Sequence, residues 1–173
     1  MLFRLASSST DQEKCLVLAR YICEHASYVL TNSQDLFSLL KTGVGQCMHY
    51  SYAYQMFLQL AGVECDFVYS EKANHSWNQV RVDGYWYNVD LTGLDEEDKR
   101  LNYAYFMVSD DFFWVKTART DDYHECVSRR YDFVRPIERV DKAGEHVIDG
   151  ISLADYQLCY ESNPWANYQW RKY

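Results

Sequence analysis

The residues from His75 to Leu91 constrain the fold more than any other stretch of this chain. Two runs rich in β-branched and aromatic residues, His75–Val82 and Tyr85–Leu91, flank the dipeptide Asp83-Gly84. Asp-Gly between two such runs is typical of a two-residue turn that joins antiparallel strands. The sequence therefore predicts a β-hairpin and, with it, an antiparallel sheet.

The register of this hairpin brings two titratable residues together. If Val82 faces Tyr85, counting outward places Trp77 opposite Asp90. His75 and Asp90 then share one face as diagonal neighbours, with their backbones roughly 7–8 Å apart. We expect His75 to bond the carboxylate through Nδ1, which leaves Nε2 free for a thiol. A register shift of one residue would move Asp90 to the other face.

The segment from Thr42 to Ala53 places a cysteine between a glycine-rich turn and a helix. Gly43 and Gly45 form the turn, and the periodicity predicts a helix from Gln46 to about Leu60 that Gly62 ends. A helix N-terminus favours the ionised thiol, so Cys47 is the candidate nucleophile. The predicted buried face of this helix comprises Ala53, Met56, Phe57 and Leu60.

Three elements are expected before the hairpin. Thr10 to Glu13 reads as a capping box, followed by an amphipathic helix of about five turns that reaches Val29. Asn32 is predicted to cap a short helix that stops near Gly43. Residues 63–70 alternate as a strand with one buried face, which includes Cys65 and Tyr69.

The pattern weakens after the hairpin. The acidic run Asp95–Asp98 indicates a solvated loop or helix start, and Tyr105–Val108 indicates a strand or buried segment. Ser109 is expected to cap the short piece that follows. Val127, Tyr131, Phe133 and Val134 suggest a further strand.

The charge and composition exclude several classes of partner. The net charge is −8 and no basic run is longer than Arg129-Arg130, so we expect no binding to nucleic acid or to an anionic membrane. No apolar run approaches the roughly 18 residues of a membrane span, and Met1–Ala6 is too short for the apolar part of a signal peptide. The location is therefore unknown from the sequence: the chain could be cytoplasmic or part of a longer secreted or exported protein.

The cysteines and histidines do not form a recognisable metal motif. None of the six cysteines belongs to a C-x-x-C pair; an even number permits disulfides, but we expect reduced and mostly buried thiols. Cys47, His49 and His75 lack a fourth ligand, so no metal and no cofactor is predicted. His49 is interpreted as a packing residue rather than a second base. His25, His124 and His146 have no carboxylate or cysteine pattern around them.

Three motifs together resemble the transglutaminase-like superfamily. They are Gly45-Gln46-Cys47, His75 to Asn78, and Gly84 to Thr92. The resemblance is closest to bacterial transglutaminase-like domains. It implies an α+β fold with a papain-like core, in which N-terminal helices pack on an antiparallel sheet and the nucleophile begins the central helix. It also implies that Cys47 is the nucleophile, His75 its base and Asp90 the residue that orients the base.

The resemblance covers about residues 10–115 of what we interpret as a single domain, 1–173. Residues 116–173 are then a C-terminal extension that completes the sheet or the cleft. The chain departs from the crosslinking enzymes at Met48, where they generally place tryptophan, and it lacks an identifiable counterpart of their calcium sites.

The implied activity is acyl transfer from peptide or protein amide bonds through a thioester on cysteine. A protease or amidase is the favoured form. The alternatives are an amine-accepting transglutaminase or acyltransferase, and a peptide-binding module without turnover. The backbone N–H of Cys47 is one candidate oxyanion donor. Gln46 and Trp77 are candidates for oxyanion or substrate binding, although Gln46 could only fix the turn and Trp77 could only pack.

Overall fold

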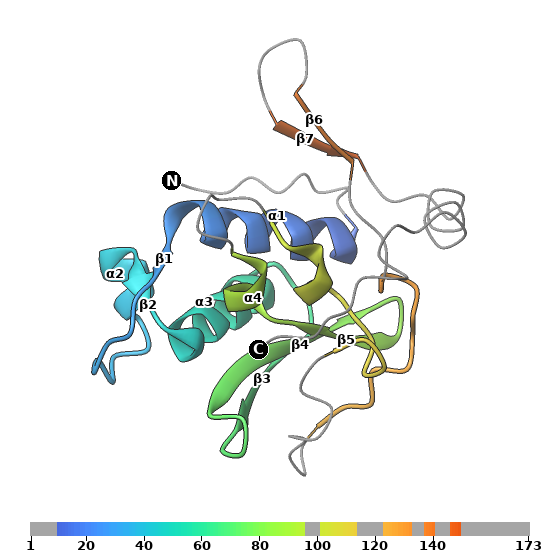
Figure 1. Cartoon of the computed structure of the whole chain (residues 1–173). Coiled ribbons are helices and arrows are strands. Elements are labelled where there is room, and N and C mark those ends of the chain that lie inside the picture. Colours follow the sequence, from blue (N-terminus) through green and yellow to red (C-terminus); the bar gives the residue numbers. More distant parts are fainter. Residues whose placement is uncertain (1–9, 96–100, 114–122, 133–136, 141–145, 150–173) are drawn as a thin grey trace.

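A three-stranded antiparallel sheet and the helices on one of its faces form the body of the protein (Figure 1). The structure is a computed structural model that describes residues 10–95, 101–113, 123–132, 137–140 and 146–149. The sheet has the order β3-β4-β5, with β3 at Cys65–Ser70, β4 at His75–Val82 and β5 at Tyr85–Val89. This mixture of helices and antiparallel sheet confirms the predicted α+β class.

The hairpin forms with the predicted register. Val82 pairs with Tyr85, and the pairing continues to Asn78 and Val89. Asp83 and Gly84 both have positive φ, at 52° and 84°, as a two-residue turn of this hand requires. The second strand ends at Val89, because Leu91–Leu94 turn into the short helix α4 that Asp90 caps.

Helices α1 (Asp11–His25) and α3 (Cys47–Leu60) cover one face of the sheet (Figure 1). The capping box at Thr10 and Glu13 is present as predicted, but α1 is shorter than the expected five turns. It ends at His25 because the next residues pair with a later segment. Strand β1 (Ser27–Tyr28) runs parallel to β2 (Val44–Gly45).

The second helix, α2 (Ser38–Thr42), begins later than expected. Phe37, not Asn32, is its N-cap residue, and the side chain of Phe37 makes no capping bond. Hydroxyl and carboxylate groups before it bond the backbone locally instead: Ser33 N–H donates to Thr31 Oγ1, and Phe37 N–H donates to Asp35 Oδ1. Such local bonds compete with helix formation. Gly43 ends α2 in the left-handed region, with φ at 73°.

The buried face of α3 differs from the predicted one. Ala53 is buried as expected, but Leu60 is 79% exposed, and the large buried residues are Tyr50, Tyr54 and Leu58. The two tyrosines can be buried because their hydroxyls have partners. Tyr50 donates to Asp95 Oδ2 at 2.8 Å, and Tyr54 donates to the carbonyl of Cys15 at 2.8 Å.

The other face of the sheet is covered as well, by residues that follow the hairpin. Val68, Trp77, Val108 and Phe113 form a second apolar cluster there. This explains why Val68, on the face predicted to be exposed, is buried. Tyr69, which was predicted to be buried, is 47% exposed. A strand with both faces covered need not alternate.

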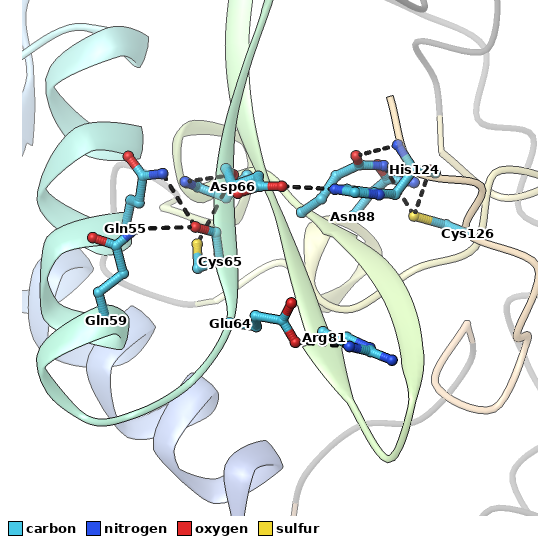
Figure 2. A network of polar contacts seen from close by, with 11 residues as sticks. Gln55, Gln59, Glu64, Cys65, Asp66, Arg81, Asn88, His124 and Cys126 are labelled. Atoms are coloured by element: carbon cyan, nitrogen blue, oxygen red, sulfur yellow. Dashed lines mark hydrogen bonds and ion pairs between the residues drawn. The ribbon is translucent and has the colours of Figure 1, made fainter. Parts of the chain in front are cut away.

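Polar contacts attach both layers to the sheet (Figure 2). On the helical side, Gln55 and Gln59 of α3 donate to the carbonyl of Cys65 at 3.1 and 3.4 Å. On the other side, His124 Nε2 lies 2.7 Å from Asp66 Oδ2. The imidazole also stacks on Trp86, with ring centroids 3.8 Å apart. His124 therefore does have a carboxylate partner, which corrects the interpretation from sequence.

The later segments agree only in part with expectation. Tyr103–Tyr105 form a 3-10 turn, η1, and Phe106, Met107 and Val108 are buried, as the prediction of a buried segment requires. The Ser109 hydroxyl bonds Asp132 and does not cap a helix. Val127 is exposed and Tyr131 lies in a turn, so no strand forms at either position.

Most of the predicted C-terminal extension lies outside the described residues, as do Phe133, Val134 and positions 96–98 of the acidic run. Strands β6 (Ile137–Val140) and β7 (His146–Asp149) pair with each other. The role of residues 116–173 in completing the sheet or cleft therefore stays a prediction.

Candidate active site

Cys47 is the first residue of α3, and the turn before it is held by a buried histidine. Gln46 is the N-cap residue, and its backbone N–H donates to Nδ1 of His49 at 3.1 Å. A Cβ on Gly45 would lie 2.7 Å from Cβ of His49, so only glycine fits at this last position of β2. His49 is fully buried and caps the turn, which agrees with packing rather than a second base.

His75 and Asp90 meet where the predicted register places them. His75 opens β4, Asp90 follows β5, and His75 Nε2 lies 2.8 Å from Asp90 Oδ2. The expected contact is confirmed, but the predicted ring nitrogen is wrong. Because Nε2 is taken by Asp90, Nδ1 is the ring nitrogen left for Cys47.

The two oxygens of Asp90 have different partners. Oδ2 binds His75, whereas Oδ1 accepts from the Thr92 hydroxyl at 2.8 Å and from the backbone N–H groups of Thr92 and Gly93 at 3.1 and 3.3 Å. The carboxylate is buried, with 2% exposure. The cap of α4 thus fixes Asp90 in the position from which it orients the imidazole. Sequence reasoning missed Thr92, although Asp-x-Thr at a helix start is a recognisable capping pattern.

The thiol of Cys47 has an unusually low pKa. Burial alone would raise it, but hydrogen bonds from His75, from the Ser76 hydroxyl and from the Ser76 backbone outweigh burial and lower the pKa to about 7. The Ser76 hydroxyl is fully buried and forms no hydrogen bond of good geometry with the described residues, so a thiolate on the nearby Cys47 would give this donor an acceptor. Ser76 was not singled out from sequence, because only the fold shows that it lies near Cys47.

The imidazole of His75 shows the opposite shift. Burial lowers its pKa, but the bonds to Asp90 and Cys47 outweigh burial and raise the pKa to about 10. Between about pH 7 and pH 10 the pair is therefore a thiolate beside an imidazolium. This state supplies a nucleophile and a proton donor at neighbouring atoms.

Replacing Ser76 by alanine tests its contribution to the thiolate. We expect Ser76→Ala to raise the pKa of Cys47 by about one unit, because a hydrogen bond to a charged group contributes about 1.5 kcal/mol or more. The pH dependence of alkylation by iodoacetamide measures this. Ser109→Ala, which removes a buried hydroxyl that bonds Asp132, is the control. An unchanged midpoint in Ser76→Ala would contradict the assigned contact.

The two remaining candidates have different surroundings. Trp77 is fully buried, lies parallel to His75 with ring centroids 6.2 Å apart, and donates its indole N–H to Asn88 Oδ1 at 3.3 Å. Its N–H thus has a partner in Asn88, which argues against an oxyanion role for that group, and a part in substrate binding stays a prediction. Gln46 is half-buried, with its side-chain amide 3.5 Å from Met48 Sδ.

The other thiols in the described ranges are unlike Cys47. Cys15, Cys23, Cys65 and Cys126 are buried, whereas Cys47 is partly exposed. Burial raises the pKa of Cys15 to about 12 and raises that of Cys65 as well. Within the same ranges, no group of three or more His, Cys, Asp or Glu side chains is arranged to hold a metal ion, and no helix is both long and apolar enough to span a bilayer.

A family comparison agrees with this geometry. The model of the transglutaminase-like superfamily matches residues 3–91, a span that is more than half of the 173-residue chain and includes Cys47, His75 and Asp90. The chain belongs to the transglutaminase-like superfamily. The resemblance noted from the three motifs is thereby confirmed.

Individual relatives in this superfamily are distant. The chain is 23% identical over 154 residues to kyphoscoliosis peptidase of Homo sapiens and 22% identical over 154 residues to that of Mus musculus. Each match covers 76% of this chain but only 23% of the relative. A solved structure of a protein named TGase has a TM-score of 0.44 and 15% identity, over 69% of this chain and 38% of that one.

Proposed function

We propose that this transglutaminase-like protein is a cysteine peptidase or amidase that hydrolyses peptide or protein amide bonds through a thioester on Cys47. The observation that carries the proposal is the low pKa of Cys47 beside a histidine that a buried aspartate holds at 2.8 Å. A nucleophile, its base and an orienting group in hydrogen-bond contact are the parts that nucleophilic catalysis requires.

The first step forms the thioester. The Cys47 thiolate attacks the amide carbonyl carbon, and the carbonyl π electrons move to oxygen, where the backbone N–H of Cys47 at the helix start can donate. The C–N bond then breaks as the leaving nitrogen takes a proton from Nδ1 of His75. The amine departs and His75 is left neutral. Asp90 keeps Nδ1 directed at the sulfur because it holds Nε2.

The second step releases the acid. Neutral His75 takes a proton from water as the water oxygen bonds to the thioester carbon. The C–S bond breaks, which restores the thiolate beside an imidazolium. The overall reaction consumes one water for each amide bond and needs no other reactant.

Hydrolysis is favoured over transfer to an amine by two observations. The two curated relatives are named peptidases. In addition, residue 48 is methionine, whereas crosslinking transglutaminases generally have tryptophan after the cysteine. The proposed partner is accordingly a peptide or protein substrate.

Mass spectrometry of a peptide library incubated with the protein, with and without a primary amine, tests the reaction. We expect cleaved peptides in both samples and none with Cys47→Ala. A gain of about one mass unit at glutamine would make the protein a deamidase, an amidase that acts on side chains. Amine adducts in place of cleavage would replace hydrolysis by acyl transfer. Peptides that are bound but chemically unchanged would indicate a binding module and overturn the proposal.

A further inference from the structure

Large exposed apolar side chains are concentrated in one stretch of the chain. Of the ten that are exposed in the described residues, six lie between residues 28 and 44, and the other four are spread over separate elements. An exposed cluster of this kind marks an interaction surface more often than isolated exposed residues do. We name it the 28–44 surface; its members are Tyr28, Val29, Leu30, Phe37, Leu40 and Val44.

The 28–44 surface adjoins Cys47. Strands β1 and β2 lie side by side where the chain enters α3 (Figure 1). Val29 N–H donates to the carbonyl of Gly45 at 2.8 Å, and Gly45 is two residues before Cys47. Tyr28 is close to the reacting groups as well: burial raises its pKa, and the nearby charges of Cys47 and Asp90 raise it further.

The surface is also electrically balanced, although the chain has a net charge of −8. Its segment contains only two charged residues, Asp35 and Lys41, which pair with each other at 2.6 Å. The segment therefore has no net charge that could attract a charged partner. Recognition at this surface must therefore depend on apolar contact.

We propose that the 28–44 surface is the substrate subsite of the enzyme and binds a peptide with large apolar side chains, such as leucine, beside the reacting carbonyl. The surface begins next to Cys47, because Val44 is three residues before it and at most about 11 Å away along the backbone. A peptide held at Cys47 is therefore the expected occupant. An extended peptide advances about 3.3 Å per residue, so the first residues beside its reacting carbonyl reach the surface. This inference rests on the proposed function, because it assigns a substrate to that site.

Electrophilic peptides that alkylate Cys47 test the subsite without requiring turnover. The two pairs are chloroacetyl-Leu-Leu-amide with chloroacetyl-Ser-Ser-amide, and acetyl-Leu-Leu chloromethyl ketone with its Ser-Ser analogue. Once bonded to the sulfur, the chloroacetyl peptides extend toward their C-terminus and the chloromethyl ketones toward their N-terminus, so the two pairs probe both sides of Cys47. We expect the leucine member of at least one pair to react roughly tenfold faster or more, because burying a leucine side chain is favourable. Intact-protein mass spectrometry gives the rates.

Matched variants locate the effect on the protein. Leu30→Ser combined with Val44→Thr should bring the leucine-to-serine rate ratio toward one, while the rate with iodoacetamide stays unchanged. Leu60→Ser is the control, because Leu60 is 79% exposed like Leu30 but ends α3, about 20 Å from Cys47. The control should keep the full ratio.

The outcomes separate this inference from the proposed function. If Cys47 reacts readily at neutral pH but neither probe pair discriminates, the subsite is wrong and the proposed function stands. If Cys47 reacts no faster than the buried thiols, the proposed function itself fails. If the double variant keeps the full leucine-to-serine rate ratio, another part of the protein selects leucine and the 28–44 surface is not the subsite. If the double variant only converts a dimer to a monomer in light scattering, the surface is a contact between copies.

Discussion

Iodoacetamide is expected to modify Cys47 at pH 6 roughly ten times faster than a fully exposed ordinary cysteine. With a pKa of about 7 instead of 9, the thiolate fraction at pH 6 is larger by roughly a hundredfold. The lower basicity of the thiolate reduces its intrinsic reactivity by about tenfold over two pKa units. The remaining advantage is about tenfold, and the buried thiols, which the reagent cannot reach, should react far more slowly still.

His75→Ala should remove this advantage. Without the imidazole, burial is opposed only by Ser76, so the pKa of Cys47 should move back toward its ordinary value and the alkylation midpoint should rise. His124→Ala is a matched control, because His124 also binds a carboxylate at 2.7 Å, but that carboxylate, Asp66, pairs with Gln79, four residues along β4 from His75. Peptide mapping after timed labelling gives the rate at each cysteine. Uniform labelling that rises only near pH 8.5 would rule out an activated Cys47.

The parts of the site that sequence reasoning predicted are those that local rules determine. A two-residue Asp83-Gly84 turn fixes the register, and the register determines that His75 and Asp90 share a face. Likewise, a glycine turn followed by a helical period places Cys47 at a helix start. Each inference needs only contacts between residues close in sequence.

The choice of ring nitrogen could not be predicted in the same way. Both nitrogens of His75 can reach a carboxylate from a diagonal position, and the register alone does not say on which side of the imidazole the sulfur lies. That side depends on where α3 crosses the sheet. Asn78 Nδ2, for example, bonds the carbonyl of Ser51 in α3 at 3.0 Å, a contact between residues 27 positions apart.

Long-range partners also explain the errors in burial. Tyr50 and Tyr54 have polar hydroxyls and did not count toward the predicted face of α3, but Asp95 and the Cys15 carbonyl satisfy them. The pairing of His124 with Asp66 joins residues 58 positions apart. No periodicity within a segment contains this information, so the outer face of the sheet could not be foreseen.

Asp90→Asn is expected to lower the hydrolysis rate by roughly a thousandfold to ten-thousandfold, the loss seen when a triad aspartate becomes its amide. Asparagine keeps an oxygen that can accept from Thr92 and Gly93, so the cap of α4 should survive. An amide that turns its N–H₂ toward His75, however, can no longer accept from Nε2–H. The imidazolium then loses its main stabilising partner, and the remaining neutral tautomer is wrong for proton transfer at Nδ1.

The pH profile distinguishes this loss from unfolding. In the native protein, kcat/KM should rise as Cys47 ionises near pH 7 and fall as His75 deprotonates near pH 10. Because Asp90 raises the pKa of His75, Asp90→Asn should move the falling limb to lower pH, and the weaker imidazolium should move the rising limb to higher pH. Asp132→Asn, at an aspartate with the same 2% exposure, is the control and should leave both limbs in place. If Asp90→Asn unfolds at room temperature while Asp132→Asn does not, Asp90 is primarily structural; if it folds and keeps the native profile, it does not orient His75.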